Sequence, residues 1–227
     1  MKYKAVIFDL GGTLVHTSNW SDYANAARKM ASILSAPIEY FTKLWMEQSV
    51  GLGTGHFQSY HDYIRHICSQ LQLIPHDTQV QEAANMPFEM TKRMLTSHHE
   101  GGIELLTFLK TNGCKTGLIT DCATDIPTLW DDTLFAPLFD VAIFSCYEGM
   151  NKEDIRIFEL AGNKLGVKPN MCLYIADGMR QELENASKIG MSALKIQTTA
   201  ETGYNPWSER WDGPVISSLS EVMEFLE

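Results

Sequence analysis

What this chain can fold into is constrained most by a regular alternation of short apolar runs and amphipathic stretches after residue 101. Apolar runs predict strands, and apolar residues at helical spacing predict helices. Glycines at 113, 166 and 190 follow three helical stretches, where a left-handed residue commonly ends a helix. This alternation predicts an α/β fold, with a mainly parallel, Rossmann-like sheet and helices on both faces. The expected strands are 5–8, 115–120, 141–145, 171–176 and 192–196, and the expected helices are 102–112, 153–165, 181–189 and 219–226.

A helical block interrupts this pattern between the first two strands. Ser21 is a candidate N-cap for a helix that reaches Leu34, and Pro37 opens a second helix. Glycines within 51–55 break the pattern, and two further helices are expected at 60–71 and 79–95, with a kink or break at Pro87. We therefore expect an α/β core domain of residues 1–18 and 97–227, and an inserted all-helical cap domain of residues 19–96. Residues 207–214 are expected to form a loop.

Composition limits the kinds of partner. The 227 residues carry a formal net charge of −10, which argues against nucleic acid because phosphate backbones need a basic surface. A small phosphorylated ligand needs only a local positive group. We recognise no signal peptide and no apolar segment long enough to span a bilayer, so we expect no membrane partner and a cytoplasmic location. The five cysteines are scattered without a CxxC pair, which favours reduced thiols.

Polar residues follow four of the apolar runs. Asp9 ends the first run and is followed closely by the Gly11–Gly12 turn, while Thr120, Lys152 and Asp177 follow later runs. In a parallel sheet these positions converge on one crevice at the carboxyl ends of the strands. Two carboxylates there suit a hard cation such as Mg2+. The lysine, the threonine hydroxyl and the N–H groups of the glycine turn suit a phosphate group.

Four short motifs, each at the end of an expected strand, resemble those of one family. They are FDLGGTL at 8–14, GLITD at 117–121, SCYEGMNK at 145–152, and IADG at 175–178 followed by Glu182. In their order and spacing the chain resembles the haloacid dehalogenase (HAD) superfamily over nearly its whole length. The resemblance is to the phosphatase-like branch that carries a helical, C1-type cap after the first motif.

The resemblance implies a mechanism and a cofactor. Asp9 would attack phosphorus and form an aspartyl-phosphate, which water then hydrolyses. Mg2+ would be bound by Asp9, the Gly11 carbonyl and Asp177. Thr120 and Lys152 would act with Asp9 as catalytic residues that bind the transferred phosphoryl group and stabilise its charge. The other phosphate-binding positions that the resemblance implies are Gly11, Gly12 and Asp121.

The chain departs from the pattern of the family at several of these positions. Gly11 stands where the phosphatases usually have an aspartate that serves as general acid and base, a role worth roughly 10²–10⁴-fold. His16 is a candidate replacement for that acid. Asp121 stands where an asparagine is usual. Glu182, near Gly178, replaces a second aspartate and is expected to orient the lysine or a metal-bound water.

These observations predict a Mg2+-dependent phosphohydrolase that acts on a small phosphorylated metabolite, as a monomer or homodimer. A metal-independent 2-haloacid dehalogenase is one alternative, for which Arg28 is the candidate cap arginine. A phosphonate hydrolase is another, for which Lys29 or Lys43 would form the Schiff base. A third is a catalytically weak protein that binds a phosphorylated ligand, because Gly11 removes the acid.

Overall fold

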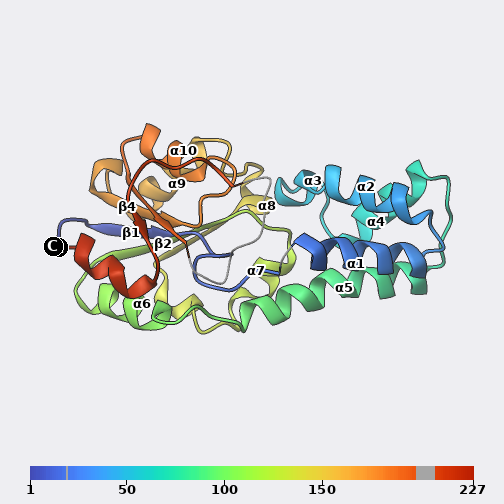
Figure 1. Cartoon of the computed structure of the whole chain (residues 1–227), viewed down its shortest axis with the longest axis horizontal. Helices are drawn as coiled ribbons and strands as arrows, with labels where there is room; N and C mark the ends of the chain where they lie inside the picture. Colours follow the sequence, from blue (N-terminus) through green and yellow to red (C-terminus); the bar gives the residue numbers. More distant parts are fainter. Residues whose placement is uncertain (19, 198–207) are drawn as a thin grey trace.

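A six-stranded, wholly parallel sheet forms the centre of the molecule, in a computed structural model that describes residues 1–18, 20–197 and 208–227. The strand order is β3-β2-β1-β4-β5-β6 (Figure 1). Asn19 and Trp207, which begin the expected cap and the expected loop, lie outside the described residues. The parallel sheet confirms the α/β fold expected from the alternation. The strands are β1 (Ala5–Phe8), β2 (Lys115–Thr120), β3 (Val141–Phe144), β4 (Cys172–Ala176), β5 (Ser192–Ile196) and β6 (Val215–Ile216).

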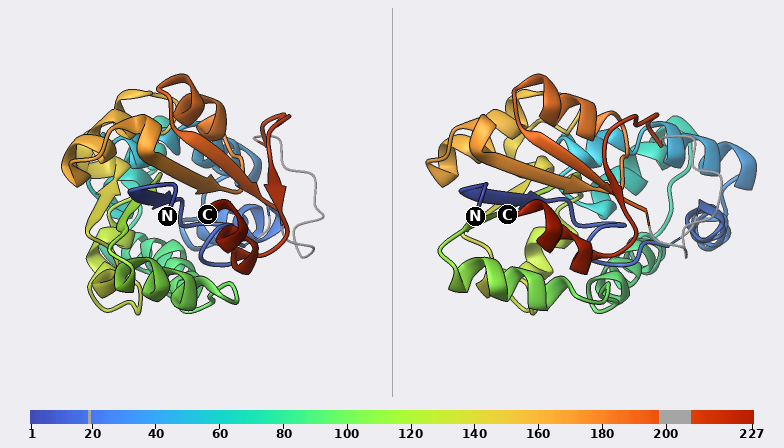
Figure 2. Two further views of the ribbon diagram at one scale, coloured as in Figure 1. Left: turned by 90° about the vertical axis from the view of Figure 1, so that its left-hand side faces the viewer. Right: turned by 60° about the vertical axis from the view of Figure 1, so that its left-hand side comes forward.

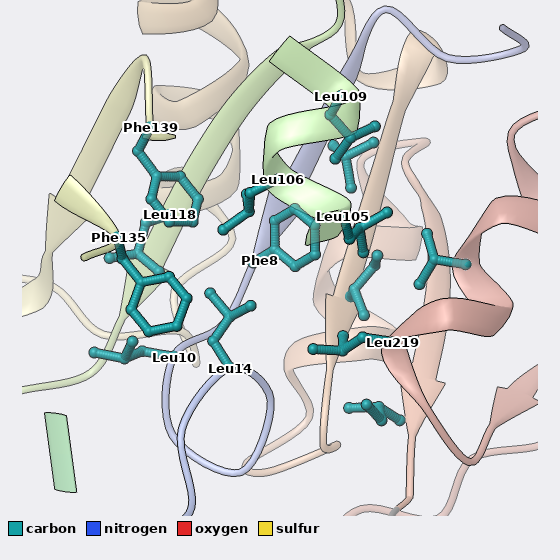
Figure 3. Close-up of a cluster of buried hydrophobic side chains, with 14 of the residues drawn as sticks. Phe8, Leu10, Leu14, Leu105, Leu106, Leu109, Leu118, Phe135, Phe139 and Leu219 are labelled. Atoms are coloured by element: carbon teal, nitrogen blue, oxygen red, sulfur yellow. The ribbon is translucent and has the colours of Figure 1, made fainter. Parts of the chain in front are cut away.

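Helices cover both faces of the sheet, and β1 is buried between them. Val6 and Phe8 point into one hydrophobic cluster, which also contains residues of α6 (Gly102–Thr111) and η3 (Leu219–Phe225) (Figure 3). Ala5 and Ile7 point into a second cluster with residues of α9 (Arg156–Leu165) and α10 (Glu182–Lys188). Because successive residues of a strand face opposite sides, this run must be apolar throughout, as it is.

Five helices form a separate unit that lies beyond the carboxyl ends of the strands (Figures 1 and 2). They are α1 (Trp20–Ile33), α2 (Ile38–Glu47), α3 (Val50–Gly53), α4 (Tyr60–Gln70) and α5 (Asp77–Leu95). Their inward side chains, among them Phe41, Tyr63 and Ile67, form a hydrophobic cluster distinct from the two clusters at the sheet. We call α1–α5 the helical unit.

The helical unit contacts the core through the segments that follow β2 and β3. The buried Asp125 carboxylate, at the start of α7 (Asp125–Trp130), accepts hydrogen bonds from Tyr60 Oη at 2.9 Å and from Thr91 Oγ1. Thr124 Oγ1 donates to the Gln58 carbonyl at 3.0 Å. These bonds join α4, α5 and the loop before α4 to the edge of the sheet that carries the predicted site.

The chain enters and leaves the helical unit at one place. His16 N donates to the Ser97 carbonyl at 2.8 Å, and His99 N donates to the Leu14 carbonyl at 2.9 Å, so the two crossings pair as antiparallel strands. The rings of His16 and His99 lie 3.8 Å apart between centroids. The two ends of the described chain also meet, since Lys2 N donates to the Leu226 carbonyl at 2.8 Å (Figure 2).

Several local features differ from the sequence predictions. Helix α5 continues through Pro87, which is buried within it, because packing against α1 and α4 outweighs the missing N–H. Helix α9 begins at Arg156 rather than at 153, since the Asp154 side chain accepts from Arg156 N at 3.0 Å. Residues 219–225 form a 3₁₀ helix. The alternation missed β6, α3, α7, α8 (Ser145–Glu148) and the 3₁₀ turns η1 (Ala136–Leu138) and η2 (Pro169–Met171).

Candidate active site

The register of three neighbouring strands brings the predicted residues to one edge of the sheet. Phe8 at the end of β1 pairs with Leu118 on β2 and with Ile175 on β4. Asp9 follows Phe8 directly, whereas Thr120 and Asp177 each lie two residues beyond their strand's partner of Phe8. Asp9 and Thr120 are buried, with 5% and 3% of their surface exposed. The carboxyl edge of the sheet therefore presents two carboxylates and a hydroxyl, as the sequence predicts.

The Gly11–Gly12 turn is shaped by the carboxylate beside it. Gly12 has φ +74°, and a Cβ there would lie 2.4 Å from Asp177 Oδ2. Only glycine adopts this φ without strain and leaves room for that oxygen. The Gly12 N–H donates to the Val15 carbonyl at 2.8 Å, so this donor is already used within the turn.

Lys152 lies buried between two carboxylates. Its ammonium group donates to Asp9 Oδ1 and, at 2.6 Å, to Glu182 Oε2. Thr13 Oγ1 donates to the other oxygen of Asp9 at 3.0 Å. Lys152 follows α8, which comes after β3, and β3 is the neighbour of β2 on the side away from β1. A buried ammonium group is stable only when it is paired with carboxylates. Lys152 can therefore be charged at this position because Asp9 and Glu182 lie beside it.

The Glu182 carboxylate is saturated with donors. Besides Lys152 it accepts from Tyr174 Oη at 2.7 Å, from Met179 N at 2.8 Å and from Gly178 N at 3.2 Å. The side chain is fully buried. Its contact with the Lys152 ammonium group is the one that the expected lysine-orienting role requires.

Two further side chains hold the backbone of the lysine. Asp121 Oδ1 accepts from Lys152 N at 3.0 Å, and Asn185 Nδ2 donates to the Lys152 carbonyl at 2.9 Å. The Asp121 carboxylate, which the sequence assigned to phosphate binding, is thus engaged with the Lys152 main chain.

The ionisation of these groups follows from burial and from their neighbours. Burial raises the pKa of Asp9 to about 7, against the opposing effect of Lys152. Burial disfavours the charged form of Lys152, but the Asp9 and Glu182 carboxylates outweigh it and raise the pKa of the lysine. Burial likewise acts to raise the pKa of Glu182, but the lysine holds it below its usual value. Lys152 and Glu182 are therefore a charged pair.

One oxygen atom of Asp177 lacks a hydrogen-bond partner among the described residues. This atom, Oδ1, is buried. Burial, together with the Glu182 and Asp9 carboxylates, raises the pKa of Asp177 well above its usual value. Oxygen atoms of Asp9, Asp177 and Glu182 lie within 4.8 Å of one another. A divalent cation bound by Asp9 and Asp177 fits this donor set, because it supplies the missing positive charge and satisfies the orphaned oxygen.

The side-chain space at Gly11 is partly filled by Thr17. A Cβ on Gly11 would lie 3.0 Å from the Thr17 methyl carbon. His16, the candidate replacement acid, is exposed, and its ring lies against the His99 ring at an interplanar angle of 49°. Burial and the neighbouring His16 lower the pKa of His99 to about 4, so His99 is neutral near pH 7.

The residues that the alternative functions need lie on the outside of the helical unit. Arg28 is exposed and donates to the Asn25 side chain at 3.0 Å. Lys29 is exposed, and Lys43 lies 3.9 Å from Glu47 within the same helix. No contact of these three side chains with the candidate site occurs within the described residues.

Sequence reasoning missed several residues that support the site. Tyr174 lies in an apolar strand and Asn185 in a short helix, and both point inward to polar partners. Thr13 follows the glycine turn that the analysis already singled out, and its spacing of four from Asp9 was an available signal. Nothing in the local sequence marks the other two.

The fold and the site are those of an α/β enzyme with its ligand site at the carboxyl edge of the sheet. A family model described as a haloacid dehalogenase-like hydrolase matches residues 3–190, and the chain belongs to that family. A relative from Pyrococcus furiosus named glyceraldehyde 3-phosphate phosphatase is 26% identical over 233 residues, covering 100% of this chain and 94% of that protein.

Solved structures share the fold. A HAD phosphatase of Thermococcus onnurineus superposes with a TM-score of 0.66 at 20% identity, covering 98% of this chain and 97% of the other. A HAD family enzyme of Bacteroides thetaiotaomicron, solved in complex with magnesium and inorganic phosphate, gives a TM-score of 0.62 at 15% identity, covering 92% and 98%. Among the described residues, no helix is long and apolar enough to span a membrane.

Proposed function

We propose that this protein is a Mg2+-dependent phosphohydrolase that acts on a small phosphorylated metabolite through an aspartyl-phosphate on Asp9. The observation that carries the proposal is the unpartnered, buried Asp177 oxygen beside Asp9 and the lysine that pairs with Asp9. Together they form a site in which the proposed nucleophile lies beside both a candidate cation ligand and a fixed positive charge. The names of the Pyrococcus and Thermococcus proteins support the same class of reaction.

Each residue then has a distinct part in the reaction. An Asp9 oxygen attacks phosphorus, the bond to the leaving oxygen breaks, and water later attacks the phosphorus of the aspartyl-phosphate to release phosphate. Lys152 and Thr120 stabilise the charge on the transferred phosphoryl oxygens. Glu182, with Gly178 N–H and Tyr174, keeps the lysine charged and in place.

Asp9, Asp177 and the Gly11 carbonyl would hold the Mg2+ ion. When bound, the ion offsets the charge of the phosphate and of the two carboxylates. Gly12 keeps space for the Asp177 carboxylate by having no side chain. Asp121 contributes by fixing the main chain at the lysine.

The helical unit is proposed to act as the cap, with the domain boundaries at 18/19 and 96/97. Two observations support this role: the helical unit lies beyond the carboxyl ends of the strands (Figure 1), and it is bonded to Asp125 and Thr124 after β2. A cap in this place excludes water and sets substrate specificity. The paired crossings at His16 and His99 would be its hinge.

A second candidate function is a phosphate-ligand-binding protein with little turnover. The observation that favours it is the Thr17 methyl group over Gly11, because it fills space that an acidic side chain would need. This candidate keeps the cation and the ligand but has no group to protonate a poor leaving oxygen.

Phosphate release tests both candidates. The panel contains small sugar and triose phosphates, beginning with glyceraldehyde 3-phosphate, together with an aryl phosphate, each with Mg2+ and with EDTA. We expect Mg2+-dependent release that Asp9→Asn abolishes and that Asp132→Asn, the same change at an exposed carboxylate, leaves intact. Mg2+-dependent ligand binding without release would favour the second candidate. Release that survives Asp9→Asn would refute the proposed nucleophile.

A further inference from the structure

Two cysteines that are far apart in the sequence meet beside the candidate site. Thr120 on β2 pairs with Phe144 on β3, and Cys122 and Cys146 each lie two residues beyond that pair. The two segments remain joined past the strand ends, since Cys122 N donates to Ser145 Oγ at 2.9 Å. Neighbouring strands are about 4.8 Å apart, which is within the Cα separation that a disulfide spans.

The two sulfur atoms are already in contact. Cys122 Sγ and Cys146 Sγ lie 3.9 Å apart, and both side chains are buried, with 6% and 7% of their surface exposed. Both thiols are free. A disulfide needs the sulfurs to approach to about 2.05 Å, so a relative movement of roughly 1.9 Å closes the bond.

We propose that Cys122 and Cys146 are a modification site, at which a hydroperoxide such as hydrogen peroxide forms an internal disulfide that lowers turnover at the neighbouring active site. Formation of the bond rests on the geometry of the two thiols alone. Its effect on turnover rests also on the proposed phosphohydrolase function.

The chemistry balances with peroxide as the oxidant. The thiolate of one cysteine attacks an oxygen of hydrogen peroxide, the O–O bond breaks, and a sulfenic acid and one water form. The second thiol attacks that sulfur, the S–O bond breaks, and a second water leaves as the disulfide forms. Two electrons and two protons pass from the thiols to the peroxide.

The environment makes Cys146 the thiol that reacts first. The hydrogen bond from Cys122 lowers the pKa of Cys146, whereas burial raises the pKa of Cys122 well above its usual value. A thiolate is the nucleophile in such reactions, so the acidic partner attacks and the other resolves the intermediate.

The bond would disturb the site from two directions. Cys122 directly follows Asp121, whose carboxylate holds the Lys152 main chain. On the other side, the helical unit packs tightly on Cys146: a Cβ at Gly55, which has φ +71°, would lie 2.2 Å from the Cys146 carbonyl oxygen. Closing the gap of roughly 1.9 Å rotates both cysteine side chains out of their present packing. This change in packing shifts the Asp121 support of the lysine or the Gly55 contact of the helical unit. Misplacement of about 1 Å can reduce catalysis roughly 10²-fold.

Mass spectrometry tests the bond without reference to activity. Cys122 and Cys146 share one tryptic peptide, residues 116–152, and the other three cysteines lie in different peptides. After hydrogen peroxide treatment of the full chain and blocking of free thiols, we expect this peptide unblocked and about 2 Da lighter, and restored by dithiothreitol. Cys122→Ser and Cys146→Ser should not form it, and Cys114→Ser should. A peptide that stays fully blocked at every peroxide concentration would refute the modification site.

Activity on the best substrate from the phosphate panel tests the consequence. The oxidised protein should lose at least tenfold in turnover and regain it with dithiothreitol, while the Cys122→Ser protein stays insensitive. Disulfide formation with unchanged turnover would refute the inhibitory role and keep the site. A reversible loss that persists in Cys122→Ser would assign the effect to another residue. Absence of turnover in the reduced protein too would instead refute the proposed function.

Discussion

Replacing Gly12 with alanine tests the link between the glycine turn and Asp177, the proposed cation ligand. The new Cβ would lie 2.4 Å from Asp177 Oδ2, so the carboxylate must retreat by about 1 Å to reach an ordinary contact. The backbone also stays at φ +74°, which costs an alanine about 1–2 kcal/mol. For a chain of this length that free energy corresponds to a fall in Tm of roughly 2–8 °C. A displaced ligand should raise the Mg2+ concentration needed for half-maximal activity at least tenfold.

The matched control is the neighbouring residue. Gly11→Ala has no positive φ to strain, and its Cβ meets only the methyl group of the exposed Thr17, at 3.0 Å. We expect its Tm to change by less than about 2 °C and its Mg2+ requirement to stay the same. Thermal unfolding with and without Mg2+, and Mg2+ titration of activity, measure both effects. Equal behaviour of the two variants would refute the argument that Gly12 exists to make room for Asp177.

Three further predictions follow from the site and the hinge. The first is the double substitution Gly11→Asp with Thr17→Ser, in which the serine removes the methyl group over position 11. It should raise the turnover of alkyl phosphates relative to aryl phosphates by up to roughly 10²–10⁴-fold. An unchanged ratio would show that no acid is missing. Lys152→Met should lower the free energy of unfolding by about 3–5 kcal/mol at pH 7, because it leaves buried carboxylates without a counter-charge. Urea unfolding at several pH values should show that this deficit shrinks as pH falls, because the carboxylates become protonated. Because the pKa of His99 is lowered to about 4 from 6.5, the stability from its neutral form is complete above pH 6.5 and is lost as pH falls toward 4. This lost stability should reach about 3 kcal/mol, and His99→Gln should flatten the measured slope.

The elements that the sequence predicted well are those in which local pattern and tertiary role agree. The residues of β1 are apolar on both faces because both faces are covered, and each long helix carries an apolar stripe. Asp9, Lys152 and Asp177 gather at one sheet edge because parallel strands present their carboxyl ends together. The missed elements are short: α7 and α8 have six and four residues, too few for a period to show.

Other features could not be predicted because they depend on contacts between distant residues. Asp125 looks like an ordinary residue at a helix start, yet its carboxylate accepts hydrogen bonds from hydroxyl groups on α4 and α5. The positions of the cysteines in the sequence did not predict which of them meet, because the contact of Cys122 with Cys146 arises only from the register of β2 against β3. The saturation of Glu182 depends likewise on how β4 and α10 pack, so spacing alone left its role open.

The position of β1 in the sheet has a consequence for the order of events during synthesis. β1 is synthesised before the other strands of the sheet, yet it lies in the middle and pairs with β2 on one edge and with β4 on the other. Roughly 160 residues separate its end from the start of β4. At ribosomal speeds of about 5–20 residues per second, one edge of this apolar strand waits roughly 10–30 s for its partner. The strand that leads into Asp9, the proposed nucleophile, is thus the strand with the longest exposure to chaperones and to misassembly before the sheet is complete.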